Sequence, residues 1–134
     1  MADPKSIIER HVQAFAAKDA EAEPHGANAE MVAPGGQFDG RDQVLGFLGA
    51  FWEAFPDGRL EIVRSIGEGS SVAAEGVFSG THTGILRTPN GDVPPTGRKV
   101  KLRWMAMYEI SGEELTSEHL YFDQSEFMTQ LGLA

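Results

Sequence analysis

The stretch KVKLRWMAMYEI at residues 99–110 alternates apolar side chains with other side chains along its whole length. This period of two is that of a β-strand, in which successive side chains point to opposite faces. One face is apolar and carries Val100, Leu102, Trp104, Ala106, Tyr108 and Ile110. The other face mixes charges with methionines and carries Lys101, Arg103, Met105, Met107 and Glu109. We predict that this strand buries its first face in the core of the protein.

Met105 and Met107 are unusual on a strand face that should otherwise be exposed to solvent. They could pack beneath a neighbouring loop of the same chain. The face could also form a subunit interface, where methionine is enriched relative to the rest of the surface. We favour the interface, which predicts a homodimer that associates through the outer face of the sheet.

Three further segments have the period of two and are expected to be strands: residues 60–66, 72–83 and 115–122. Turns at residues 68–70 and 111–113 each contain a glycine and should join neighbouring strands as hairpins. Residues 84–97 are rich in glycine and proline and are expected to form a long loop. The order of these segments predicts an antiparallel sheet.

Apolar residues at helical spacing predict helices on both sides of these strands. The helical segments are residues 4–18, 20–23, 41–55 and 125–131, and a short strand with a turn is expected at 31–36. Asp3 and Pro4 suit the start of the first helix, as a capping side chain and a first-turn proline. Helices segregated from strands along the chain indicate an α+β fold, with the helices covering one face of a curved sheet.

The composition restricts the classes of protein to which the chain can belong. A length of 134 residues fits a single domain, 1–134. The absence of cysteine excludes disulfides, thiolate metal sites and cysteine nucleophiles. A net charge of −9 argues against binding to nucleic acid. The first residues lack the pattern of a secretory signal, and no apolar run approaches the ~20 residues of a membrane span, so a cytoplasmic protein is expected without a membrane partner.

Candidate catalytic residues gather at the ends of two predicted strands. Strict alternation places His119, Tyr121 and Asp123 on one face of the last strand, where they would line a cavity beneath the helices. His82 ends an earlier strand, a position more typical of a structural, hydrogen-bonded histidine than of a catalyst. Asp123 has an alternative role as the N-cap of the last helix, because Glu126 follows three residues later.

These side chains do not have the spacing of a known metal motif, so no metal site is expected. The sequence also lacks a glycine-rich phosphate loop after a strand and a GxSxG nucleophile motif. Acid/base chemistry by side chains is therefore favoured over metal-assisted or nucleophilic catalysis.

Several short motifs together resemble the SnoaL-like polyketide cyclases, a family of the superfamily that includes nuclear transport factor 2 and ketosteroid isomerase. The motifs are Gly80-Thr-His-Thr-Gly84, Pro94-Pro-Thr-Gly-Arg98, Tyr121-Phe-Asp123 and Gln130-Leu-Gly-Leu133. The resemblance implies a cone-shaped barrel around a pocket and a cofactor-free intramolecular aldol cyclisation of a polyketide ester. It also implies that Asp123 is the acid/base and that His82 lies near the pocket rim.

In such a reaction Asp123 would remove a proton from a carbon between two carbonyl groups, and His82 or His119 would hydrogen-bond the enolate oxygen. Aromatic side chains would form the walls for a small apolar or aromatic polyketide-like substrate: Phe15, Phe51, Trp52, Phe78, Trp104, Tyr108 and Tyr121. Two alternatives stay open at this stage. One is an isomerase or hydratase with the same fold, and the other is a non-catalytic domain that binds small molecules.

Overall fold

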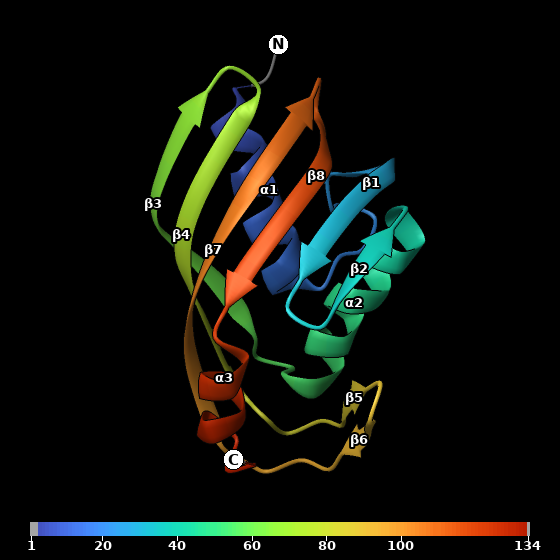
Figure 1. Ribbon diagram of the computed structural model, residues 1–134, viewed down its shortest axis with the longest axis vertical. Helices are drawn as coiled ribbons and strands as arrows, with labels where there is room; N and C mark the ends of the chain where they lie inside the picture. Colours follow the sequence, from blue (N-terminus) through green and yellow to red (C-terminus); the bar gives the residue numbers. More distant parts are fainter. Residues whose placement is uncertain (1–2, 134) are drawn as a thin grey trace.

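The strand that was predicted at residues 99–110 is β7, Lys99–Ser111, and it lies inside a six-stranded sheet (Figure 1). The structure is a computed structural model that describes residues 3–133. The sheet has the order β2-β1-β8-β7-β4-β3, with every neighbouring pair antiparallel except β1 and β8, which are parallel. The other strands of this sheet are β1 (His25–Ala33), β2 (Gly36–Asp39), β3 (Arg59–Glu68), β4 (Ser71–Thr81) and β8 (Glu114–Phe122).

Helices α1 (Pro4–Ala17) and α2 (Arg41–Ala54) lie behind the sheet in Figure 1, and α3 (Gln124–Gln130) lies at its lower end. Helix α1 contacts β3 and β4, α2 contacts β1 and β2, and α3 contacts β7. The Asp3 side chain accepts a hydrogen bond from the Lys5 amide, as expected for the N-cap of α1. The α+β architecture predicted from the sequence is confirmed, with a sheet that stays open between its edge strands β2 and β3.

The alternation of β7 is preserved in the fold, because its even-numbered side chains from Val100 to Ile110 are buried and most of its odd-numbered ones are exposed. Trp104 lies on this buried face, directly over Gly76 of β4. A Cβ atom at position 76 would overlap the indole ring and lie 2.5 Å from the carbonyl oxygen of Glu61. Glycine at this position therefore allows the largest side chain of the core to lie flat on the sheet.

Strand β8 does not follow the strict alternation that the sequence analysis assumed. Glu109 pairs with Ser117 and Ile110 pairs with Leu115, so Thr116 has no partner on β7. An extra residue of this kind is a β-bulge, and it reverses which face the following side chains occupy. Leu115 and Glu118 are consequently both buried, whereas Tyr121 is exposed.

Four other predictions are corrected by the structure. Residues 20–23 form turns and not a helix, and the first strand begins at His25, six residues earlier than expected. The sheet is mixed because β1 pairs with β8, a partner distant in sequence that local patterns do not reveal. The loop at 84–97 contains a small hairpin of β5 (Leu86–Thr88) and β6 (Gly91–Val93).

No helix of the described chain has the length and apolar character to cross a membrane.

The close packing of Trp104 on Gly76 gives a prediction for stability. Gly76→Ala should lower the free energy of unfolding by about 1–3 kcal/mol, because the added methyl group overpacks the core. Gly46→Ala is the matched control, since Gly46 lies in α2 with open space around its Cβ position. That substitution should raise the stability by about 0.5–1 kcal/mol. Urea unfolding would measure both, and equal stability of the two variants would contradict the packing argument.

Candidate active site

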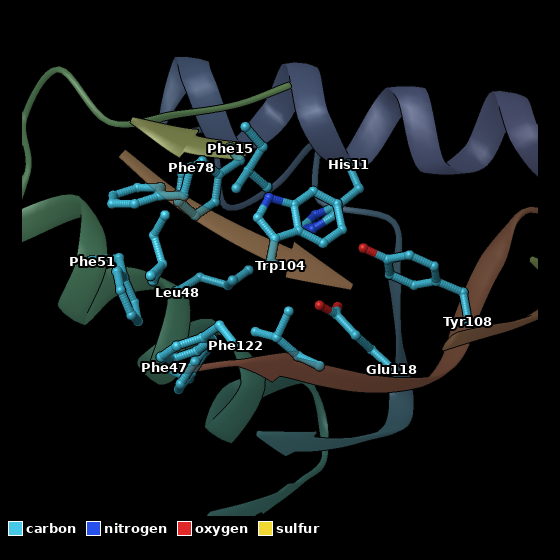
Figure 2. Close-up of a pocket in the computed structure, with 13 residues that line it drawn as sticks. His11, Phe15, Phe47, Leu48, Phe51, Phe78, Trp104, Tyr108, Glu118 and Phe122 are labelled. Carbon is cyan, nitrogen blue, oxygen red and sulfur yellow. The ribbon is translucent and has the colours of Figure 1, made fainter. Parts of the chain in front are cut away.

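A pocket lies between the sheet and helices α1 and α2 (Figure 2). Its walls are mostly aromatic and aliphatic and consist of Phe15, Phe47, Leu48, Phe51, Leu60, Phe78, Leu102, Trp104, Leu120 and Phe122. The remaining lining residues, His11, Tyr108 and Glu118, carry ionisable groups. The space open to the centre of a water-sized sphere is about 50 Å³, room for a few water molecules. An apolar pocket with a few convergent polar groups is typical of a site for a small molecule.

Each wall of the pocket follows from the periodicity of one element. On α1, His11 and Phe15 are four residues apart and therefore share one side of the helix. On α2, Phe47 and Phe51 repeat the same spacing. Strands β7 and β8 contribute residues two positions apart, which point to the same face of the sheet.

Glu118 lies on β8, in the part of the strand that the bulge turns towards the helices. Its side chain is buried, and its Oε1 atom is 2.9 Å from Nε2 of His25. Figure 2 shows the carboxylate of Glu118 and the hydroxyl of Tyr108 directed into the same region, next to Trp104 and His11. A carboxylate, a phenol and an imidazole thus lie together in the pocket.

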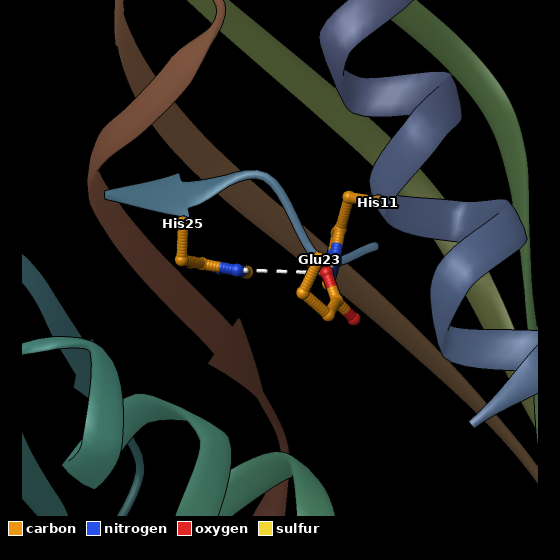
Figure 3. Close-up of side chains that lie close together, drawn as sticks. All are labelled: His11, Glu23 and His25. Carbon is orange, nitrogen blue, oxygen red and sulfur yellow. Dashed lines mark hydrogen bonds and ion pairs between the residues drawn. The ribbon is translucent and has the colours of Figure 1, made fainter. Parts of the chain in front are cut away.

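Behind the pocket, His11, Glu23 and His25 form a buried cluster (Figure 3). Nδ1 of His11 is 2.6 Å from Oε1 of Glu23, and Nδ1 of His25 is 3.5 Å from the same oxygen. Arg41 fixes the backbone that carries Glu23 and His25, because its guanidinium donates hydrogen bonds to both of their carbonyl oxygens. A buried carboxylate needs such partners, because an isolated charge in the interior is strongly unfavourable.

The cluster shifts the proton affinities of its members. Burial alone would lower the pKa of His25, but the hydrogen bond with Glu118 and the opposite charges of Glu118 and Glu23 outweigh it and raise the pKa to about 9. Burial would raise the pKa of Glu23, and the charge and hydrogen bond of His11, with those of His25, lower it instead. Burial, together with the charges of Glu118 and Glu23, raises the pKa of Tyr108 well above its ordinary value.

The spacing of His11, Glu23 and His25 bears on whether they could hold a metal ion. One donor atom from each lies within 4.8 Å of the others, so distance alone would permit a divalent cation. The contacts fit a proton-sharing cluster better, since His11 is already in hydrogen-bond contact with Glu23 and His25 with Glu118. The guanidinium of Arg41 also places a permanent positive charge beside this backbone.

The structure places the residues of the predicted catalytic set apart from one another. Asp123 is exposed and its Oδ1 accepts a hydrogen bond from the Glu126 amide, which is the capping role that the sequence left open. His119 is partly exposed and 3.0 Å from Glu30 on the outer side of the sheet. The expectation that His119, Tyr121 and Asp123 line the cavity is therefore wrong, because the bulge at Thr116 reverses this part of β8.

His82 is fully buried but is not part of the pocket lining. Its Nδ1 atom is 2.9 Å from the hydroxyl of Thr96 and accepts a hydrogen bond from the Thr96 amide. Its backbone also bonds Gly97 and Arg98, so His82 holds the end of the loop against the strand. Burial lowers its pKa, which favours the neutral ring that these contacts require.

Five of the seven aromatic side chains predicted for the pocket line it: Phe15, Phe51, Phe78, Trp104 and Tyr108. Trp52 packs against Phe15 outside the lining, and Tyr121 lies on the outer face of the sheet. Sequence reasoning missed Glu23 and Glu118, and it gave His11 and His25 no particular role. The local signals were His11 in α1 and Glu118 in β8, two ionisable residues among apolar neighbours on the same face of their element. Their convergence depends on contacts between distant segments, which local patterns do not show.

A family model described as SnoaL-like polyketide cyclase matches residues 9–131 of the chain. None of the curated proteins compared with the chain matches it. Among solved structures, a protein assigned as a SnoaL-like polyketide cyclase from Jannaschia sp. CCS1 superposes with a TM-score of 0.83 at 17% identity. The alignment covers 98% of this chain and 92% of the other.

IdmH from Streptomyces antibioticus, assigned as a polyketide cyclase, has a TM-score of 0.82 and 24% identity, with 98% and 99% of the two chains covered. A protein with a ketosteroid isomerase-like fold from Catenulispora acidiphila DSM 44928, in complex with trimethylamine, has a TM-score of 0.78 and 20% identity. That alignment covers 96% of this chain and 93% of the other. At these identities the structural matches establish the fold.

The raised pKa of His25 predicts how stability depends on pH. The imidazolium is stabilised in the folded state, so its contribution is complete below about pH 6.5 and is lost as the pH rises through about 9. The free energy of unfolding should fall over this range by up to about 3 kcal/mol. Urea unfolding followed by tryptophan fluorescence at several pH values would measure the loss.

His25→Gln should remove most of this pH dependence and destabilise the protein mainly at the lower pH. His119→Gln is the control, because His119 pairs with Glu30 at the surface and should leave the pH dependence in place. An unchanged slope in His25→Gln would show that another group is responsible.

Proposed function

Because the chain belongs to the SnoaL-like polyketide cyclase family, we propose that it is an acid/base enzyme of the polyketide cyclase type, with Glu118 as the base. The observation that carries this proposal is the position of the Glu118 carboxylate in the wall of an otherwise apolar pocket. The aromatic walls suit a small apolar or aromatic polyketide-like substrate. The narrow cavity suits a flat molecule, with Phe47 and Phe51 as half-buried side chains that can adjust to it.

The chemistry begins with a substrate carbon that lies between two carbonyl groups. Glu118 removes the proton from this carbon, and the electrons of the C–H bond remain on the substrate as an enolate. The enolate carbon attacks a second carbonyl carbon of the same molecule, which forms the ring and breaks the carbonyl π bond to give an alkoxide. A protonated side chain of the pocket then gives this alkoxide the proton that completes the hydroxyl group. Because the raised pKa of Tyr108 keeps its hydroxyl protonated, Tyr108 can donate a hydrogen bond to the developing oxygen anion. Only protons and one carbon–carbon bond change, so the proposal includes no cofactor.

Glu118 replaces Asp123 as the proposed base on geometric grounds. A general base must lie within hydrogen-bond reach of the proton that it removes. Asp123 is exposed and capping α3, whereas Glu118 lines the pocket and is held by His25. The proposed reaction therefore keeps the class of chemistry that the family resemblance implied and moves it to another carboxylate.

Substitution of the two carboxylates separates these assignments. The protein should catalyse deuterium exchange at the central carbon of an aryl 1,3-diketone in D₂O above the uncatalysed background rate. Glu118→Gln should reduce this catalysed rate by about a hundredfold or more. Asp123→Asn should leave the exchange rate unchanged, because asparagine caps a helix as well as aspartate does. Proton NMR would follow the exchange, and tryptophan fluorescence would measure binding of the same diketone.

The opposite result, with exchange lost in Asp123→Asn and retained in Glu118→Gln, would return the role to Asp123. Binding of the diketone without exchange by the unmodified protein would indicate a small-molecule-binding domain. Exchange without ring closure on any diketone ester would instead favour an isomerase.

We also propose that the outer face of the sheet forms a homodimer. Met105, Met107 and Tyr121 lie side by side there and are 53%, 47% and 59% exposed. Along β7 the outward residues run from basic Lys101 to acidic Glu109, with the methionines between them. A twofold axis near Met105 would set Lys101 of one copy opposite Glu109 of the other, so the face complements itself in charge.

The dimer proposal is tested with matched lysine substitutions. Met105→Lys should give a monomer, because it places two unpaired charges near the twofold axis. Ile85→Lys is the control, since Ile85 is an exposed apolar residue next to β5, away from this face. Light scattering after size-exclusion chromatography would measure the mass. A monomeric unmodified protein, or a dimer that persists in Met105→Lys, would contradict the proposal.

A further inference from the structure

Four ionisable side chains form a series of contacts that begins and ends at the pocket, in the order Glu118, His25, Glu23, His11. The successive atom pairs are 2.9, 3.5 and 2.6 Å apart, so the first and last pairs are hydrogen-bonded and the middle pair, His25 and Glu23, is an ion-pair contact without a hydrogen bond. The first and last members line the pocket, and the two middle members do not. All four are at most 2% exposed. The pocket therefore touches both ends of a chain of groups that water does not reach from outside.

We propose that His25 and Glu23 are positioning residues that couple Glu118 to His11, so that a proton gained at one end favours proton release at the other. The inference deepens the proposed function and rests on it, because it concerns how the base of that reaction is restored. His25 and Glu23 do not touch the substrate in this arrangement. They act through the two groups that do.

The coupling follows from the charges that face His25. Glu23 approaches it from the segment before β1, Glu118 from β8 and His11 from α1, and Tyr108 of β7 packs against His11. Arg41 of α2 bonds backbone carbonyl oxygens and not these carboxylates, so the histidines are their direct counter-ions. Removing the charge of Glu118 by protonation takes away one of the two anions that hold the proton of His25. That proton then associates with Glu23, in competition with the proton of His11.

The proposed cyclisation uses both ends of the series. Glu118 takes a proton from the substrate carbon and changes from a charge of −1 to 0. An imidazolium at His11 gives a proton to the new alkoxide and changes from +1 to 0, so the total charge of the buried cluster is constant. A small shift that brings Nδ1 of His25 to hydrogen-bond distance from Glu23 would let a proton return from Glu118 to His11 through both residues. This transfer restores both groups without entry of water into the pocket.

Titration of the histidine rings by ¹⁵N NMR tests the coupling without a substrate. The chain has four histidines, which single substitutions can assign. Glu118→Gln imitates the protonated base, and it should lower the titration midpoint of His25 by about one pH unit or more. It should also reduce the proton occupancy of His11 at pH 7. When His25→Gln is combined with it, the effect of Glu118→Gln on His11 should disappear.

Two further variants keep the test decisive. Glu23→Gln interrupts the same series one link later, and it should likewise remove the response of His11, which covers the case that His25→Gln does not fold. Glu30→Gln is the matched control, because Glu30 is 3.0 Å from His119 at the surface and should alter only the His119 signals. The inference is overturned if Glu118→Gln leaves His11 unchanged, or changes it equally when His25 is absent.

The proton titration tests the coupling between the histidines and the exchange assay tests the proposed base, so either claim can fail while the other is retained. Loss of diketone exchange in Glu118→Gln without any coupling between the histidines would retain the proposed base and reject the role of His25 and Glu23. Stoichiometric binding of Zn²⁺ that displaces the protons of His11 and His25 would also reject it, in favour of a metal site.

Discussion

The pairing of β7 with β8 is the constraint on which the site depends. One extra residue, Thr116, lies in β8 between the pairs Glu109–Ser117 and Ile110–Leu115. Because side chains alternate along a strand, a single unpaired residue moves every later side chain to the other face. Without this bulge His119 would face the pocket and Glu118 would face outwards. Which ionisable groups line the pocket is therefore decided by a backbone irregularity two residues before Glu118.

Once Glu118 is turned inwards, the surroundings must compensate for a buried charge. The fold supplies His25 from β1, which is the parallel neighbour of β8 in the sheet. Glu23 and His11 continue the arrangement, and Arg41 holds the backbone in place. Burial of ionisable groups is costly, and an alternation of acid and base offsets part of this cost because each group has an opposite charge as its neighbour. Stability and acid/base capacity then depend on the same side chains.

The two faces of the sheet carry different kinds of side chains. The inner face of β7 combines a flat tryptophan on Gly76 with the aromatic walls of the pocket. The outer face places methionines between a basic and an acidic end. Because the same strand carries both faces, an interface on the outer side would stiffen the sheet that positions the pocket. Such an arrangement would link the oligomeric state of the protein to the geometry of the site.

The sequence by itself determined the fold class, the strands of the meander, the cap at Asp3 and most aromatic walls of the pocket. These features follow from local periodicity and from the chemistry of single residues, which need no knowledge of distant partners. Tertiary structure alone decided that β1 lies beside β8, that β8 is bulged, and that Glu118, His25, Glu23 and His11 converge. Each of these depends on pairing between segments far apart in the chain. The bulge shows in the sequence only as a change of phase between Leu115 and the apolar pair Leu120 and Phe122. Strict alternation therefore placed Asp123 on the pocket face, where the structure has Glu118.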